Sequence, residues 1–323
     1  MASLKKIPVI RKTCTVRDVV DAHHDDAQDM LDVCYRLYTK TALALADMKS
    51  KRWVNCVNPD YSDDLHYIAA KVGRKGVYTL NLSYEWACTT TARDNDKAKG
   101  GVTLYRTLDW PVKGMADKLV VARHEGPAGE YWNMTYPGFV GVLNGMAPGR
   151  FSIAINQAPV VKRGYTIAGD WLAARRDMFR SKEIPAPFLL RKVFEEAANY
   201  GEAVEMLEKT TMCTPALFTV AGVKEGEHCV IERKPNEAIV HKGSKSCISN
   251  HWINDDWKGH PRPPVSHDRR AQMIGNYNDF KGNFAWVTPP VLNAHTRLAF
   301  EADAKAGTLS LRCYEELKPV TQT

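Results

Sequence analysis

Two strand-like segments separated by a turn constrain the fold of this chain more than any other feature. Trp86 to Arg93 is mostly small and β-branched, and Val102 to Trp110 is a second strand-like run. Asp94-Asn95-Asp96 and Gly100-Gly101 lie between them. Such runs, bounded by Asp, Asn and Gly, are typical of an antiparallel hairpin. We therefore predict that the start of the first strand lies beside the end of the second.

Helices and strands are predicted in separate blocks along the chain. Thr15 with Asp18 indicates a capped helix start, and apolar residues at helical spacing continue to Leu45. Pro185 predicts the start of a second helical block, and Ser266 the start of a later helix. The other predicted strands cover residues 76–82, 119–123, 139–143, 151–156, 216–223, 229–233 and 239–241, with a turn at 145–149 and a hairpin over 297–314. This segregation favours an α+β layered fold over an alternating parallel one.

The 323-residue chain has the composition of an ordinary globular protein, with 44% hydrophobic and 25% charged residues. No apolar run is long enough to span a bilayer, so we expect no stable membrane insertion. The N-terminal stretch MASLKKIPVIRK lacks the apolar core of a secretory signal, which favours a cytoplasmic location. The net charge of +7 comes with short basic runs that lack interleaved aromatics, so we expect no nucleic-acid partner.

The cysteines of the chain do not form a recognisable metal site. Eight of them are scattered without a CxxC pair, and no Cys/His spacing is typical of zinc. We expect no metal and no organic cofactor, and we expect most of the thiols to be reduced and buried.

The predicted hairpin brings three reactive side chains together. Antiparallel pairing of its strands places Arg106 and Asp109 near Cys88. A neighbouring guanidinium lowers the pKa of a thiol and makes it a better nucleophile at neutral pH. A carboxylate at this position can hold an amine or bridge the arginine. From spacing alone, a buried structural cysteine beside a surface Arg/Asp pair is the alternative.

These residues also carry a resemblance to a known family. Cys88-Thr89-Thr90 followed by Arg106-Thr107-Leu108-Asp109 resembles paired motifs of the acid ceramidase and N-acylethanolamine acid amidase group, within the choloylglycine hydrolase superfamily. The stretch from Gly141 to Ser152 is similar to the family's glycine-rich turn. Ser249-Asn250-His251-Trp252 with Asp268-Arg269-Arg270 resembles a later pair of family motifs. The resemblance covers the chain from about residue 76 onward, with Thr107, Gln157 and His267 as departures from the family pattern.

The resemblance implies a fold and a maturation step. The fold is the N-terminal-nucleophile (Ntn) hydrolase αββα sandwich, in which two stacked antiparallel sheets lie between helical layers. The family makes a precursor that cleaves itself before its cysteine, here between Ala87 and Cys88. Residues 1–87, a helical segment and a first strand, then form a small subunit. Residues 88–323 form the catalytic large subunit, and both belong to one compact domain.

The resemblance also implies roles for single residues. Cys88 is the nucleophile, and its freed α-amine, with a pKa of about 7.7–8.0, is the general base. Arg106 supports the thiolate or the substrate, and Asp109 orients the amine. Asn250 donates to the oxyanion, and Arg269 braces the group. The alternatives are a turn role for Asn250 and an exposed helix position for Arg269, with Arg270 beside it. The residues assigned to substrate binding are Asn144, Trp110 and Trp252.

The function implied is hydrolysis of a linear N-acyl amide through a Cys88 thioester, with a small-molecule substrate as the partner. Two alternatives stay open. An acyltransferase of the isopenicillin acyltransferase type would pass the acyl group to an added acceptor. A catalytically silent relative would keep the fold, bind a ligand and never cleave itself. Homo-oligomerisation is also left open by the sequence.

Overall fold

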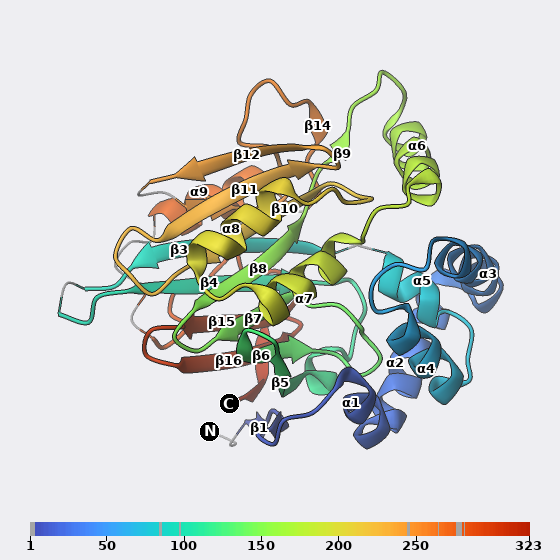
Figure 1. The fold of residues 1–323 in the computed structure, drawn as a ribbon, viewed down its shortest axis with the longest axis horizontal. Helices are drawn as coiled ribbons and strands as arrows, with labels where there is room; N and C mark the ends of the chain where they lie inside the picture. The colour runs from blue at the N-terminus through green and yellow to red at the C-terminus, as the bar shows by residue number, and fades with distance from the viewer. Residues whose placement is uncertain are drawn as a thin grey trace.

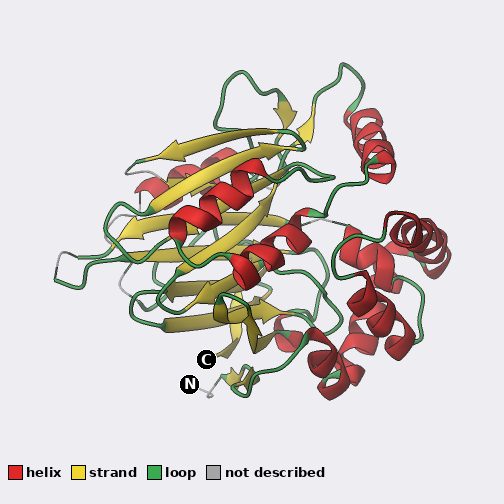
Figure 2. Cartoon of the chain, in the orientation of Figure 1, coloured by secondary structure: helices red, strands yellow, loops and turns green. Residues whose placement is uncertain are grey.

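The structure is a computed structural model that describes residues 4–83, 86–96, 98–243, 246–263, 265–275, 280 and 282–323. Two large β-sheets lie at the centre, and helices cover both outer faces (Figures 1 and 2). Helices α7 and α8 pack on one sheet, and α9 packs on the other. This is the α+β sandwich predicted from the sequence.

The first sheet carries the predicted hairpin. Its strand order is β1-β17-β16-β15-β4-β3-β13. Ala87 pairs with Asp109, Cys88 with Leu108 and Thr90 with Arg106 across β3 and β4, which confirms the predicted pairing. The bounds are β1 Lys5–Lys6, β3 Ala87–Asp94, β4 Val102–Asp109, β13 Ser246–Ile248, β15 Thr296–Asp303, β16 Thr308–Glu315 and β17 Lys318–Gln322.

The second sheet has the strand order β12-β11-β10-β8-β7-β6-β5-β2. Each sheet is antiparallel except at one edge, where β1 pairs parallel with β17 and β2 pairs parallel with β5. The bounds are β2 Val9–Ile10, β5 Val120–Gly126, β6 Gly129–Thr135, β7 Asn144–Ala147, β8 Phe151–Gln157, β10 Ala216–Ala221, β11 His228–Lys234 and β12 Glu237–Lys242. A small ribbon joins β9 Val160–Val161 to β14 Gly259–His260.

The N-terminal helices form one group, whereas the later helices are spread over the sheets. The N-terminal helices cluster at one end of the sheets (Figure 1), with the bounds α1 Val16–Ala22, α2 His24–Tyr38, α3 Lys40–Val57, α4 Ser62–Val72 and α5 Val77–Leu82. The later helices are α6 Ile167–Arg180, α7 Ala186–Glu196, α8 Tyr200–Lys209 and α9 Ser266–Gly275, with a short 3-10 turn at Ala116–Lys118. Among the described residues, no helix is both long enough and apolar enough to cross a membrane.

The main core cluster joins side chains of both sheets with those of the helices that cover the second sheet. Leu104, Phe300, Phe218 and Phe194, all fully buried, belong to it. A second cluster, which includes Val20, Val54 and Leu65, holds the N-terminal helices together. Thr15 caps α1 with the predicted reciprocal box to Asp18.

Three sequence-based assignments are wrong. Residues 76–82, predicted as a strand, form α5, because the apolar positions 77, 78 and 82 face one helical side and pack on the N-terminal helices. Residues 139–143 form no strand, and the pairing strand β7 begins at Asn144 and takes in the first three residues of the turn predicted at 145–149. The single long helix predicted to Leu45 is divided into α1, α2 and α3, with breaks at His23 and Thr39.

Candidate active site

Cys88 lies at the start of β3 and is fully buried. Its thiol faces the neighbouring strand, where Nη2 of Arg106 donates to the Cys88 sulfur at 2.9 Å. Arg106 is also fully buried. The structure therefore brings together the thiol and the guanidinium that the hairpin predicts.

Arg106 is held rigidly by acceptors on the second sheet. Its Nη2 donates to the Ile155 carbonyl at 2.7 Å and its Nη1 to the Leu143 carbonyl at 3.1 Å and to the side-chain oxygen of Asn144. Asn144 in turn donates from Nδ2 to the Met134 carbonyl at 2.8 Å. Both ends of the Asn144 amide are occupied, so this residue orients Arg106 in the intact chain.

The electrostatics of Cys88 differ from the sequence-based prediction. Burial raises the pKa of the Cys88 thiol above its ordinary value, and the nearby Asp109 raises it further, while Arg106 and Arg269 act in the opposite direction. The prediction of a lowered pKa is wrong for the intact chain because desolvation outweighs the guanidinium. Sequence alone shows the neighbouring charge but not the depth of burial.

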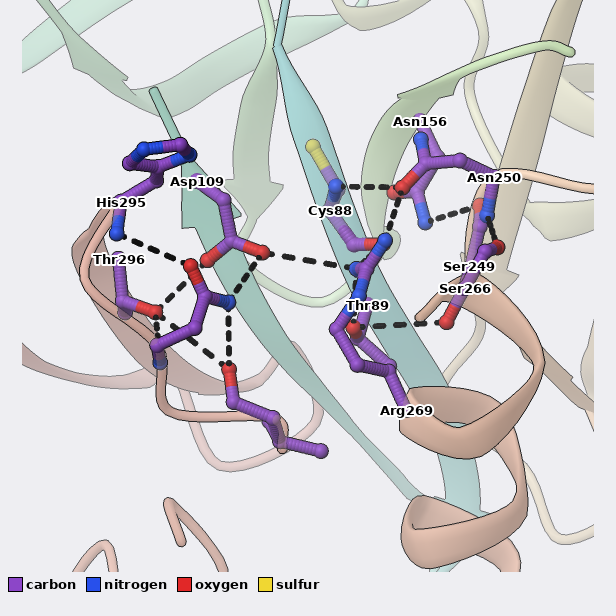
Figure 3. Close-up of polar contacts among 12 residues, drawn as sticks. Cys88, Thr89, Asp109, Asn156, Ser249, Asn250, Ser266, Arg269, His295 and Thr296 are labelled. Carbon is purple, nitrogen blue, oxygen red and sulfur yellow. Dashed lines mark hydrogen bonds and ion pairs between the residues drawn. The ribbon is translucent and has the colours of Figure 1, made fainter. Parts of the chain in front are cut away.

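The backbone of Cys88 is held at both of its polar atoms (Figure 3). Its N–H donates to Oδ1 of Asn250 at 2.8 Å, and its carbonyl accepts from Nη1 of Arg269 at 2.7 Å. The Nδ2 group of Asn250 donates to the Gln157 carbonyl at 2.8 Å. Asn250 is thus a direct partner of the nitrogen in the Ala87–Cys88 peptide bond.

Arg269 joins the other members of the group. This fully buried side chain donates to Oδ1 of Asn250 at 2.9 Å and to the Thr89 hydroxyl at 2.8 Å, and lies 3.5 Å from Asp109. Arg270, next along α9, is half-buried and donates to the Cys247 carbonyl instead. The exposed position weighed for Arg269 is therefore wrong. Burial lowers the pKa of Arg269, and Asp109 and Cys88 oppose that effect.

Asp109, at the end of β4, lies on the other side of Arg269. Thr296 donates to Oδ1 at 2.8 Å, and Asn293 donates to Oδ2 at 3.0 Å (Figure 3). Burial raises the pKa of this carboxyl group, and Arg269, Asn293 and Thr296 lower it. In the intact chain the N–H of Cys88 is bound by Asn250, while Asp109 is bound by this separate set of donors.

Sequence reasoning missed Asn293 and Thr296. They belong to a turn in which the Asn293 N–H donates to the Thr296 hydroxyl at 3.0 Å. Thr296 then pairs with Asp109 across β15 and β4. The available signal was a polar Asn-x-x-Thr turn directly before a predicted strand, but its partner lies 187 residues away in the chain.

A cavity of about 260 Å³ lies beside the Ala87–Cys88 bond, lined by Trp86, Ala87, Asp109, Pro111, Gln157, Arg262, Pro263 and His295. Trp86 also lines an apolar cavity of about 50 Å³ together with Met30, Leu31 and Trp110. Trp110 therefore lies at the site. Trp252 packs edge-on against Trp257 at 5.0 Å, and it is not among the described residues that line these two cavities.

Within the described ranges, no group of three or more His, Cys, Asp or Glu side chains is placed to hold a metal ion. The chemistry available at the site is that of a buried thiol, its own peptide bond, two arginines, one carboxylate and one amide.

No model of a known protein family matches the chain. The chain is 33% identical to the acid ceramidase of Heterocephalus glaber over 216 residues, which cover 61% of this chain and 53% of that protein. Its match to the human acid ceramidase is 34% identical over 105 residues, or 32% of this chain and 25% of that protein. The chain therefore spans about half, or less, of these relatives. A solved structure, the Caenorhabditis elegans ortholog of N-acylethanolamine-hydrolyzing acid amidase, is similar with a TM-score of 0.50 and 24% identity, over 67% of this chain and 92% of that one, and it shows a shared fold.

Proposed function

We propose that this chain, which is similar to acid ceramidases and shares the fold of an N-acylethanolamine-hydrolyzing acid amidase, is an autoprocessing cysteine amide hydrolase. It cleaves its own Ala87–Cys88 bond and then hydrolyses a linear N-acyl amide. Residues 1–87 become the small part and residues 88–323 the catalytic part, which remain packed as one domain.

The observation that carries the proposal is the way Cys88 is held. Its sulfur accepts from Arg106 at 2.9 Å, its N–H donates to Asn250 at 2.8 Å, and its carbonyl accepts from Arg269 at 2.7 Å. β13 ends opposite Thr90, so the backbone of any residue at position 88 needs partners on this edge. The guanidinium on the sulfur is the contact that an inert buried cysteine does not need. A nucleophile does need its thiol and its amine fixed relative to each other.

In the proposed maturation step, the Cys88 sulfur attacks the Ala87 carbonyl carbon, and the C–N bond between Ala87 and Cys88 breaks. The thiol proton moves to the released nitrogen, which becomes the α-amine of Cys88. Water then hydrolyses the thioester and leaves Ala87 with a free carboxylate. Because the thiol is fully buried in the intact chain, withdrawal of the Ala87 end would admit water and reduce the desolvation that raises the thiol pKa. The effect of Arg106 on the thiol pKa would then outweigh desolvation, and the pKa would fall far enough for the thiolate to form.

In the mature enzyme the α-amine takes the thiol proton, and the sulfur attacks the substrate carbonyl. Asn250 keeps the amine in place through Oδ1, and Arg269 links Asn250 to Asp109. Nδ2 of Asn250 is the candidate donor for the oxyanion. In the intact chain this group is bonded to the Gln157 carbonyl, so its use requires that bond to open.

The apolar cavity supports an acyl chain on one side of the reacting bond. It adjoins the bond through Trp86, and none of its described lining residues is charged. Its apolar lining suits an acyl group, but at about 50 Å³ in the intact chain the cavity must widen to hold a long one. The names of the relatives, acid ceramidase and N-acylethanolamine acid amidase, are consistent with an N-acyl amide as substrate.

One observation favours the silent ligand-binding alternative: in the intact chain Cys88 is fully buried and its pKa is raised. An assay with fluorogenic N-acyl amides of short, medium and long acyl chains separates the two functions. We expect hydrolysis that prefers the longer chains and is absent in Cys88→Ala. Ligand binding without turnover by a processed or unprocessed chain would overturn the proposal, and diversion of the acyl group to an added amine or thiol acceptor at the expense of free acid would indicate an acyltransferase.

A further inference from the structure

Residues at the start of α9 form hydrogen bonds with β13 and with the residues that follow it. Arg269 binds the side chain of Asn250, and Arg270 donates from Nε to the Cys247 carbonyl at 2.8 Å. Ser266 adds a third contact, because its hydroxyl oxygen accepts the Asn250 backbone N–H at 2.8 Å. Asn250, the partner of the Cys88 nitrogen, is therefore attached to α9 through both its side chain and its backbone.

The Ser266 hydroxyl has a second partner, Nδ1 of His251, at 2.8 Å. Since the Ser266 oxygen already accepts from Asn250, its own proton is free to point at His251. When that proton points at Nδ1, Nδ1 is the acceptor and the imidazole is neutral, with its proton on Nε2. Ser266 and His251 are both buried, at 3% and 6% exposure.

The surroundings of His251 disfavour a positive charge on its imidazole ring. Its ring stacks on His267, with centroids 3.9 Å apart and planes 26° apart. The charged groups that act on it are Arg269 and Arg270, both cationic. Burial, then His267, Arg270 and Arg269 lower the pKa of His251 to about 3.

We propose that His251 is a positioning residue of this site: its neutral imidazole accepts the Ser266 hydroxyl proton and so fixes Asn250 against the Cys88 nitrogen. The inference rests on the proposed function, because it assigns to His251 the placement of a group used in self-cleavage and amide hydrolysis. His251 itself touches no reacting atom.

A dependence on pH follows. An unfolded histidine has a pKa of about 6.5, whereas His251 in the folded chain has a pKa of about 3. Between these values the unfolded chain binds one more proton at this residue, so stability falls as the pH decreases from about 6.5 toward 3. A side chain that accepts the same hydrogen bond without titrating removes this part of the acid sensitivity.

The test compares His251→Asn and His251→Leu. The asparagine oxygen can replace Nδ1 as acceptor, whereas leucine cannot. We expect His251→Leu to slow formation of the 87-residue fragment by about tenfold, the effect of losing one buried hydrogen bond, and His251→Asn to restore most of the rate. The matched control is His124→Asn on β5, another buried histidine whose pKa is lowered mainly by burial, which should leave cleavage unchanged.

A second readout does not depend on cleavage. In the Cys88→Ala background, melting temperatures are measured from pH 4 to pH 7 with and without His251→Asn, and the parent should lose more stability on acidification than the variant. Equal cleavage rates and pH profiles for the parent and His251→Leu would overturn the inference, as would folded Asn and Leu variants that are equally slow. If no chain cleaves at all, the proposed function fails, and the melting series alone decides the inference: parallel melting profiles overturn it.

Discussion

Two regions meet at the Ala87–Cys88 bond, and they are built on different principles. On the side of residues 88–323, buried polar groups surround Cys88, and each of Arg106, Asn250 and Arg269 makes several hydrogen bonds. On the side of residues 1–87, helices α2 and α5 present Met30, Leu31 and Leu80 to an apolar cavity. The comparison teaches that the polar groups around Cys88 belong to one part, while the other part covers them. Under the proposed function, the covering part also carries the chain end that is released.

The cover is nevertheless firmly attached. Asn81 donates to the Gly138 carbonyl at 3.0 Å and accepts from the Val140 N–H at 2.8 Å. Tyr61 donates to Glu195 at 2.7 Å. Contacts of this kind do not depend on the covalent link, so the account expects the two parts to stay together after cleavage.

The largest effect is expected from a substitution among the buried polar groups around Cys88. Arg106→Met removes the guanidinium from the thiol and should slow self-cleavage by about 100-fold or more, as expected when a buried electrostatic donor is lost. The rate is measured as appearance of the 87-residue fragment by mass spectrometry. Arg150→Met is the matched control, since Arg150 is also buried but donates to the Phe194 and Ala197 carbonyls. Normal cleavage by folded Arg106→Met would refute the role of Arg106.

A smaller effect is expected one step further from the thiol. Thr296→Val removes a hydrogen bond to the buried Asp109 carboxylate and should reduce amide hydrolysis by about tenfold, since bonds to charged groups are worth about 1.5–3 kcal/mol. The loss should be greater at low pH, because the Asp109 pKa, already raised by burial, rises further without this donor. Steady-state kinetics across a pH series measures it. An unchanged pH profile would mean that Asp109 does not act in its charged form.

The smallest expected effect is on the cover. Asn81→Ala should lower the free energy of unfolding by about 1–3 kcal/mol, because two buried backbone groups of the other part lose their partner. Urea titration of the unprocessed Cys88→Ala chain measures it, with the exposed Asn236→Ala as control at about 0.5 kcal/mol or less. Catalysis by the folded, processed Asn81→Ala enzyme should stay near normal. A large loss of catalysis would show that the two regions are less separate than this account holds.

The sequence predicts the parts of the site that are close in the chain. Cys88 and Arg106 are joined by one hairpin, so their contact follows from strand pairing alone. The link between Asp109, Asn293 and Thr296 spans the chain and depends on how β15 docks against β4, which local pattern does not reveal. The sequence predicts a strand where α5 forms, because a short apolar run fits the period of a strand and that of a helix equally well.

The pKa of Cys88 is a second property that the sequence alone does not predict. The sequence correctly places a guanidinium beside the thiol but carries no measure of desolvation, which is a property of the packed core. His251 also becomes informative only in three dimensions, where Ser266 and His267 surround it. Polar residues whose partners are distant in the chain are thus the part of the site that is hardest to predict from the sequence.

The most direct test of the central claim is the intact mass of the purified protein under denaturing conditions, recorded beside Cys88→Ala. The account predicts that the 323-residue parent separates into parts of 87 and 236 residues, while the variant stays whole. A parent that remains whole from acidic to neutral pH, or a variant that splits at the same bond, would contradict the claim that Cys88 cleaves its own chain.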